Sequence, residues 1–415
     1  MTMENIQKAV YVYDDWSSSA PRLMGKLCAQ RARGEDVFSF EYDENWLCEQ
    51  PRIVLDPDLQ FYAGKQYLLD GKRQFGIFLD SEPDRWGRTL LKRKEGILAK
   101  KENRKPKSLS EIDFLLGVDD LTRVGAIRFK ESPDGPFLAP SSEFSVPPMK
   151  RLRELEAASL KYEEGDALDE EWMRILLAPG SSLGGARPKA NVLDEEGNLW
   201  IAKFPSKHDD YDAGAWEFVA HKLAKMCGIN VPEARLCKFS NQGSTFLVKR
   251  FDRDGERRIH FSSAMTMLGK QDGESSEASY ADIAAFLRAN GGQPKQDVQE
   301  LWKRAVFSVL IKNTDDHLRN HGFLLNKLGW SLSPMYDVNP NPYGDHLSLG
   351  ILGDECSLNA DYLVAVSSGF LVSPDEAKSF VRKAQEIISA NWIKLAKQNG
   401  ISDASIAHMK NAFIE

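Results

Sequence analysis

A short segment around residue 315 contains the side-chain types that phosphoryl transfer requires. Asp315 is followed five positions later by Asn320, and Asp337 comes 22 residues after Asp315. A carboxylate can accept the proton of an attacking hydroxyl, and an amide and a second carboxylate offer the hard oxygen ligands that Mg²⁺ prefers. A five-residue loop also lets the first two side chains face in different directions. The spacing predicts a catalytic base at Asp315 and magnesium ligands at Asn320 and Asp337.

Residues upstream of this segment could bind the phosphates of a nucleotide. Lys203 closes an apolar strand expected over 199–204, and a lysine there could neutralise α- and β-phosphates. Glu217, on the following helix, could orient this lysine through an ion pair or could be a surface residue. The glycine-rich segment 180–188 could bring backbone N–H groups to phosphate oxygens, although the Walker motif is absent.

A simpler interpretation of the segment is structural, because the run 313–315 (Asn-Thr-Asp) is also a good helix cap. The ordered lysine, amide and second carboxylate favour the catalytic interpretation over this one. Within the segment, His317 is interpreted as a structural hydrogen-bonding residue rather than a metal ligand, and Asp316 as peripheral.

The elements that must position these residues change from strands to helices along the chain. Alternating apolar residues and turn signals predict strands at 9–13, 37–42, 189–193, 199–204, 234–239 and 244–251. Apolar periodicity with capping residues predicts helices at 85–101, 151–160, 214–226, 280–289, 295–312 and 373–398. A hairpin is expected over 323–333. The order predicts an α+β, bilobal protein with a β-rich N-terminal half and a mainly α-helical C-terminal half, and the cleft between lobes is the default ligand site.

Composition excludes several classes of protein. The chain has 415 residues, 42% of them hydrophobic, and a formal net charge of −7. A protein with this balance can bury a core, and it is a poor candidate for wrapping nucleic acid through net charge. No run of 18 apolar residues occurs, and the five cysteines are scattered without a CxxC pair. These features argue against a membrane-spanning helix, a zinc ribbon and a disulfide framework, and predict a cytoplasmic location.

One expected helix, 85–101, is unusually basic, and further cations follow it up to residue 107. The simplest interpretation is a solvated face. The alternative is a surface that contacts DNA phosphates beside a DNA-binding partner.

Several segments together resemble the HipA family of serine/threonine kinases. In the kinase part they are 182–189, 249–253, 313–320 and 333–338, and the segment 75–88 resembles that family's N-terminal subdomain. The resemblance covers most of the chain and implies a bilobal protein-kinase-like (HipA) fold. It implies three parts, namely an N-terminal subdomain over 1–105, a kinase N-lobe with a glycine-rich loop over 106–250, and a helical C-lobe with the catalytic loop over 251–415.

The resemblance also implies roles for single residues. Asp315 would be the catalytic base, Asn320 and Asp337 the magnesium ligands, and Lys203 a ligand of the ATP phosphates. Further ATP-binding positions would be Ser182, Leu183, Gly184, Gly185, Lys249 and Phe251, the last two through backbone groups that bind adenine.

Ser182 stands where the family has a serine that becomes phosphorylated, which expels the loop and switches the kinase off. Ser181 is an adjacent alternative. A phosphoserine carries about −1.5 to −2 charges and would repel ATP phosphates. The chain departs from the loop of the best-known family member by having Arg187-Pro188 in place of Gln-Glu.

For function, the resemblance implies a Mg²⁺- and ATP-dependent toxin of a toxin–antitoxin pair. Its partner would be a HipB-like helix-turn-helix antitoxin, with DNA contacted only through or beside that antitoxin. Its substrate would be an aminoacyl-tRNA synthetase, commonly the glutamyl enzyme, whose phosphorylation arrests growth. Two alternatives stay open, a kinase of a small-molecule substrate and an inactive DNA-regulatory subunit bound to its antitoxin.

Overall fold

The computed structural model describes residues 7–32, 35–49, 52–68, 71–138, 146–164, 176 and 187–413. The chain divides into two compact units, and each is considered by itself. The first unit comprises 1–202 with 252–262, and the second comprises 203–251 with 263–415. The chain therefore enters the second unit, returns to the first for eleven residues and leaves it again. The division at 105 and 250 predicted from the sequence stays a prediction.

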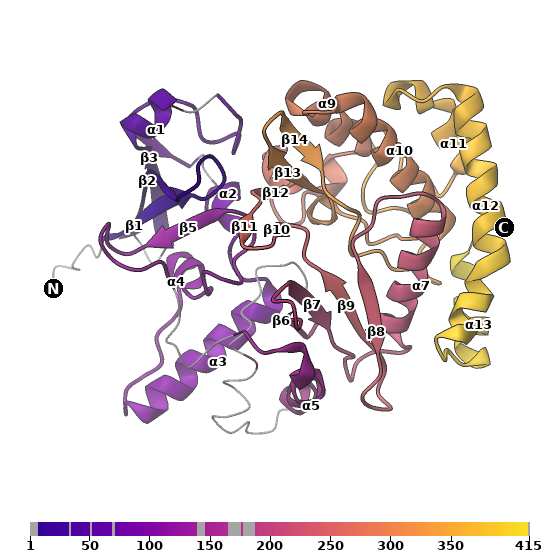
Figure 1. Ribbon diagram of the computed structural model, residues 1–415, viewed down its shortest axis with the longest axis horizontal. Helices are drawn as coiled ribbons and strands as arrows, with labels where there is room; N and C mark the ends of the chain where they lie inside the picture. Colours follow the sequence, from indigo (N-terminus) through magenta and orange to yellow (C-terminus); the bar gives the residue numbers. More distant parts are fainter. Residues whose placement is uncertain are drawn as a thin grey trace. The chain divides into compact units, whose positions relative to one another are not determined.

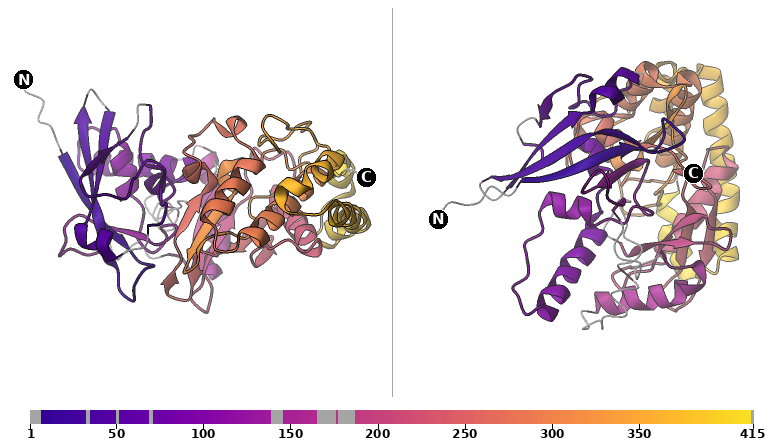
Figure 2. Two further views of the ribbon diagram at one scale, coloured as in Figure 1. Left: turned by 90° about the horizontal axis from the view of Figure 1, so that it is seen from above. Right: turned by 60° about the vertical axis from the view of Figure 1, so that its left-hand side comes forward.

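A five-stranded antiparallel sheet organises the first unit (Figures 1 and 2). In chain order the strands are β1 (Gln7–Asp14), β2 (Arg22–Ala32), β3 (Glu35–Tyr42), β4 (Lys65–Tyr67) and β5 (Ile127–Lys130). Their order in the sheet is β4-β3-β2-β1-β5, with Leu27 of β2 opposite both Val10 and Phe40. Alternate residues of β3, Phe38, Phe40 and Tyr42, are buried, as the period of two predicts.

Helices and two later strands complete the first unit. They are α1 (Glu44–Glu49), α2 (Gly76–Leu79), α3 (Arg85–Lys101), α4 (Glu111–Leu116), α5 (Leu152–Glu163), β6 (Lys189–Leu193) and most of β7 (Leu199–Lys203). The Asp84 carboxylate caps α3 by accepting the N–H of Gly87 at 2.7 Å, and it pairs with Lys189 at 3.0 Å. Because Trp86 Nε1 also donates to the Lys189 carbonyl, at 3.1 Å, the start of α3 is fixed to β6.

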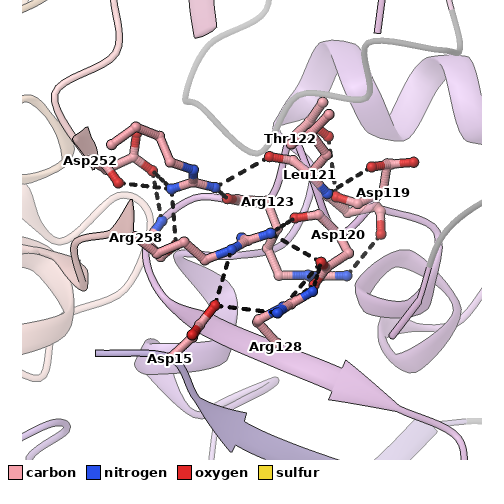
Figure 3. Close-up of polar contacts among 12 residues, drawn as sticks. Asp15, Asp119, Asp120, Leu121, Thr122, Arg123, Arg128, Asp252 and Arg258 are labelled. Atoms are coloured by element: carbon pink, nitrogen blue, oxygen red, sulfur yellow. Dashed lines mark hydrogen bonds and ion pairs between the residues drawn. The ribbon is translucent and has the colours of Figure 1, made fainter. Parts of the chain in front are cut away.

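The returning segment 252–262 joins the first unit through charged side chains (Figure 3). It contains β10 (Arg253–Asp254) and β11 (Arg257–Arg258). The Arg258 guanidinium contacts Asp120 at 3.0 Å and Asp15 at 3.6 Å, and Arg128 contacts the same two carboxylates. Buried charges are tolerated only when they are paired and hydrogen-bonded, which this network achieves. The segment is therefore built into the first unit rather than looped over it.

The second unit is mainly helical. Its helices are α7 (Ala213–Met226), α8 (Ala264–Met267), α9 (Tyr280–Asn290), α10 (Pro294–Leu310), α11 (Ala360–Ala365), α12 (Pro374–Gln398) and α13 (Asp403–Met409). Its hairpins are β8 (Ala234–Cys237) with β9 (Thr245–Lys249), and β13 (Gly322–Asn326) with β14 (Gly329–Leu332). Strand β12 (Phe261–Ser263) contains the point at which the chain passes from the first unit to the second. Helix α12 packs against α7, α10 and α11, and α9 packs against α10 (Figure 1).

Within the part of the chain that is described, no helix is both long enough and apolar enough to cross a bilayer.

Candidate active site

Lys203 is the centre of a three-residue ion cluster in the second unit. It is the last residue of β7, and its Nζ lies 2.6 Å from Glu217 Oε1 on α7 and 2.6 Å from Asp337 Oδ1 beyond β14. Burial by itself would lower the pKa of Lys203, but the two carboxylates outweigh that effect and hold the pKa above its usual range. The structure thus brings together the lysine and the distant carboxylate that the sequence assigned to one site.

Asp337 has an unusual backbone conformation. Its φ of 57° lies in the left-handed region, which few residues other than glycine adopt. Hydrogen bonds hold the chain before and after Asp337. Tyr336 Oη donates to the Arg319 carbonyl at 2.6 Å, and the N–H of Asn339, two residues after Asp337, donates to Asn313 Oδ1 at 3.0 Å. Strained backbone held in this way is typical of functional positions.

The predicted catalytic loop follows α10 and ends in a short 3-10 turn, Leu318–Asn320. Asn320 Nδ2 donates to the Asp315 carbonyl at 3.1 Å, which leaves the amide oxygen as the atom that can bind a metal. The Asp315 side chain is on an exposed residue, yet partial loss of hydration raises its pKa. The charges of Asp337 and Asp316 raise this pKa further, and His317 opposes them. A raised pKa is a common property of catalytic carboxylates.

The donor set suits magnesium held jointly with a nucleotide. Asp337 offers a carboxylate and Asn320 an amide oxygen, and Mg²⁺ usually takes one or two protein ligands together with phosphate oxygens and water. Among the residues described, no group of three or more His, Cys, Asp or Glu side chains could hold a metal ion. The residues present therefore fit a metal that arrives with phosphates.

The segment predicted to bind adenine belongs to the same unit as this cluster. Lys249 ends β9 and its N–H donates to the Glu233 carbonyl at 2.8 Å. The Phe251 ring packs on that of Tyr336, with centroids 5.6 Å apart, so it lies beside the residue that precedes Asp337. The glycine-rich-loop residues Ser181, Ser182, Leu183, Gly184 and Gly185 lie outside the described residues, and their roles stay predictions.

The interpretation of Asp316 as peripheral was wrong. Asp316 is only 2% exposed, and its carboxylate accepts a hydrogen bond from Tyr280 Oη. His321 Nε2 lies 3.0 Å from the same carboxylate, and the structural role suggested for His317 stays a prediction. Burial opposes ionisation, but His321 and Tyr280 outweigh it and hold the pKa of Asp316 below its usual value. Asp315 is therefore exposed, whereas the adjacent Asp316 is buried.

The fold and these residues define a protein of the kinase-like class, and comparisons identify the family. Residues 181–392, just over half of the chain, match the family model of the HipA-like C-terminal domain. The chain therefore belongs to the HipA-like family. A solved structure of the Shewanella oneidensis MR-1 toxin–antitoxin system HipA, HipB and its operator DNA complex matches with a TM-score of 0.68. The match covers 97% of this chain and 94% of that chain at 20% identity, which confirms the predicted α+β kinase-like (HipA) fold.

Curated relatives are similar over shorter stretches. A Haemophilus influenzae protein named "Putative kinase" is 27% identical over 246 residues, or 54% of this chain and 68% of that protein. The serine/threonine-protein kinase toxin HipA of Shewanella oneidensis is 28% identical over 218 residues, or 44% of this chain and 49% of that toxin. The match thus spans about half the length of the named toxin.

Proposed function

We propose that the protein is a Mg²⁺- and ATP-dependent kinase that phosphorylates a serine or threonine hydroxyl of another protein. The observation that carries the proposal is the position of Lys203, whose Nζ lies 2.6 Å from both Glu217 and Asp337. An ammonium has three N–H donors, and two of them are used by these carboxylates. Among the residues that the structure describes, no other carboxylate pairs with Lys203, so the third N–H can donate to a phosphate oxygen beside the candidate metal ligand Asp337. Membership of the HipA-like family and the names of its relatives support the same reaction class.

The residues divide the reaction among themselves. The Asp315 carboxylate accepts the proton of the substrate hydroxyl, whose oxygen forms a bond to the γ-phosphorus while the bond from that phosphorus to the bridging oxygen of ADP breaks. Lys203 holds the phosphates, and Glu217 fixes the position of Lys203. Asn320 and Asp337 would hold Mg²⁺, which would supply neutralisation of the phosphate charge. ADP and the phosphorylated side chain are the products.

The pH dependence should reveal the base. Because the pKa of Asp315 is raised, phosphotransfer should decline on the acidic side at a higher pH than a free aspartic acid would give, whose pKa is about 3.9. The sign follows from the required form, since only the ionised carboxylate accepts a proton. Initial rates measured between about pH 4.5 and 8 test this, with thermal unfolding followed over the same range as the control. An acidic limb no higher than that expected for a free aspartic acid would contradict the raised pKa.

The finer assignment rests on the family. The proposed role is that of a growth-arresting toxin which phosphorylates an aminoacyl-tRNA synthetase, the glutamyl enzyme first among them, and itself at Ser182 or Ser181. A HipB-like antitoxin is the proposed partner, because the similar solved structure is that of a HipA, HipB and operator DNA complex. Quantitative phosphoproteomics after induced expression, with an Asp315→Asn chain as the blank, tests the substrate and the loop serine together. If phosphate appears neither on an aminoacyl-tRNA synthetase nor on Ser181 or Ser182, the assignment is contradicted.

DNA is the second proposed partner, through or beside the antitoxin. Helix α3 offers a surface for it, because its exposed cations Arg85, Lys92, Arg93 and Lys100 follow the spacing of one helix face. At 1.5 Å per residue, this row extends for roughly 20 Å, which suits contacts with successive phosphates of a duplex.

Reversing the charge of these four side chains should weaken DNA binding and reduce its salt dependence. Each lost phosphate contact should lower the slope of log K against log salt by about 0.9. Titration of a labelled duplex with the full chain and its co-purified partner, at several salt concentrations, measures this. Lys225→Glu with Lys238→Glu, at exposed positions of the second unit, is the matched control. An unchanged slope in the α3 variant would contradict the proposed surface.

A further inference from the structure

Asp315 stands between two neighbours that are held by other parts of the second unit. On one side, the Thr314 carbonyl accepts hydrogen bonds from the N–H and the hydroxyl of Ser348, at 3.0 and 2.7 Å. The Thr314 hydroxyl accepts another from Asn341 Nδ2 at 2.7 Å, and a Cβ on Gly344 would meet that hydroxyl at 2.3 Å. On the other side is the buried Asp316. The exposed base is thus placed by its neighbours along the chain.

Three elements converge on the Asp316 carboxylate. Tyr280 Oη, from the first residue of α9, donates to it, and Ser308 Oγ, near the end of α10, donates at 3.3 Å. His321, directly after the catalytic loop, contributes Nε2 at 3.0 Å, and its ring packs edge-on against Tyr280 with centroids 5.2 Å apart. All of these side chains are buried: Tyr280 0%, Ser308 0% and His321 2% exposed. In such surroundings hydrogen bonds are strong, and a lost partner is costly.

The same network continues to Asn339, two residues after Asp337. Asn313 Nδ2 donates to Ser308 Oγ at 3.2 Å, and Asn313 Oδ1 accepts the N–H of Asn339 at 3.0 Å. Asn339 Nδ2 in turn lies 3.4 Å from Asp337 Oδ1. A continuous series of polar contacts therefore links the buried carboxylate of the catalytic loop to the segment that bears the candidate metal ligand.

We propose that Asp316, with Tyr280 and His321, is a positioning group that sets the distance between Asp315 and Asp337. The inference rests on the proposed kinase function and concerns the same site. Asp316 is excluded as a second base because its carboxylate is buried, accepts hydrogen bonds from Tyr280 and Ser308, and lies against His321. Its effect is transmitted through the backbone to Asp315 and through Ser308 and Asn313 to the segment of Asp337. A misplacement of about 1 Å at a reacting group can cost roughly 10²-fold in rate.

Removal of single hydrogen-bonding groups tests the proposal. Tyr280→Phe deletes only a hydroxyl, and Asp316→Asn keeps the shape of the side chain while removing its charge. Each change should lower kcat by about 10- to 100-fold and leave the KM for ATP and for the protein substrate within about twofold. Because both residues act through one contact, the double variant should lose little more than the more severe single variant. Ser308→Ala, a smaller change, serves if either variant fails to fold.

A merely structural role would give a different pattern. In that case activity would fall only in proportion to the loss of folded protein, measured by thermal unfolding, and kcat per folded molecule would match the parent chain. Tyr343→Phe is the matched control, since it removes a hydroxyl that contacts His408 on the exposed side of the unit. If the parent chain is active and both Tyr280→Phe and Asp316→Asn keep its kcat, the positioning role is overturned while the proposed kinase function stands. A parent that binds ATP but transfers no phosphate to any protein overturns the proposed function instead.

Discussion

Replacing Asp315 with asparagine should reduce the rate of phosphate transfer by about 10²- to 10⁴-fold, the usual contribution of a general base. The substituted side chain has the same shape and lies on an exposed residue, so the fold and ATP binding should persist. The loss should appear in kcat and not in the KM for ATP, because the carboxylate acts on the substrate hydroxyl during the reaction. Transfer of radiolabelled phosphate to a protein substrate at saturating ATP measures it.

The matched control is Asp345→Asn. Asp345 belongs to the same unit, its side chain is 88% exposed, and its carboxylate pairs with the neighbouring His346. Surface changes of this kind usually alter stability by less than about 0.5 kcal/mol, so the control should retain full activity. Undiminished transfer by the Asp315→Asn chain would remove the base from the proposed mechanism, even if ATP binding at Lys203 were demonstrated.

Local chemistry explains which parts of the site could be predicted from the sequence. Lys203, Asp315 and Asp337 stand out because phosphoryl transfer would require these residue types in this order along the chain. Helix starts were predictable for a similar reason: Asp84 caps α3 and Ser373 caps α12, and both signals lie within a few residues of the helix they begin. The glycine-rich segment also stands out by its local composition, but residues 180–186 lie outside the described residues, so its role stays a prediction.

Long-range contacts explain what the sequence did not reveal. Asp316 and Tyr280 are 36 positions apart, and no periodicity relates them, so nothing in the sequence indicated that Asp316 is buried. Strand β2 escaped prediction because it lies between β1 and β3 and buries the consecutive residues Leu27, Cys28 and Ala29. Burial on both faces removes the alternation that identifies a strand. The return of 252–262 to the first unit likewise depends on Arg258 and Asp120, 138 positions apart.

Lys203→Met should reduce ATP-dependent phosphate transfer about as strongly as Asp315→Asn does, but through a different step. Removal of a charged group that stabilises the transferred phosphoryl typically costs about 10²- to 10³-fold, and here ATP affinity should fall as well. The variant should also lose stability, unlike Asp315→Asn. Glu217 is only 7% exposed, and without the ammonium its buried carboxylate loses the cation that pairs with it. We expect a loss of about 1–3 kcal/mol in the free energy of unfolding.

The two effects of this lysine can be separated with a companion change. Adding Glu217→Met to Lys203→Met removes the buried carboxylate together with the cation that pairs with it, and replacing both members of a buried pair by apolar groups is often neutral for stability. The double variant should therefore regain thermal stability near that of the parent and still fail to transfer phosphate. Calorimetric unfolding and ATP titration on the three chains distinguish the roles. If the double variant recovered activity together with stability, Lys203 would be a structural ion-pair residue, and phosphate binding would have to be assigned elsewhere.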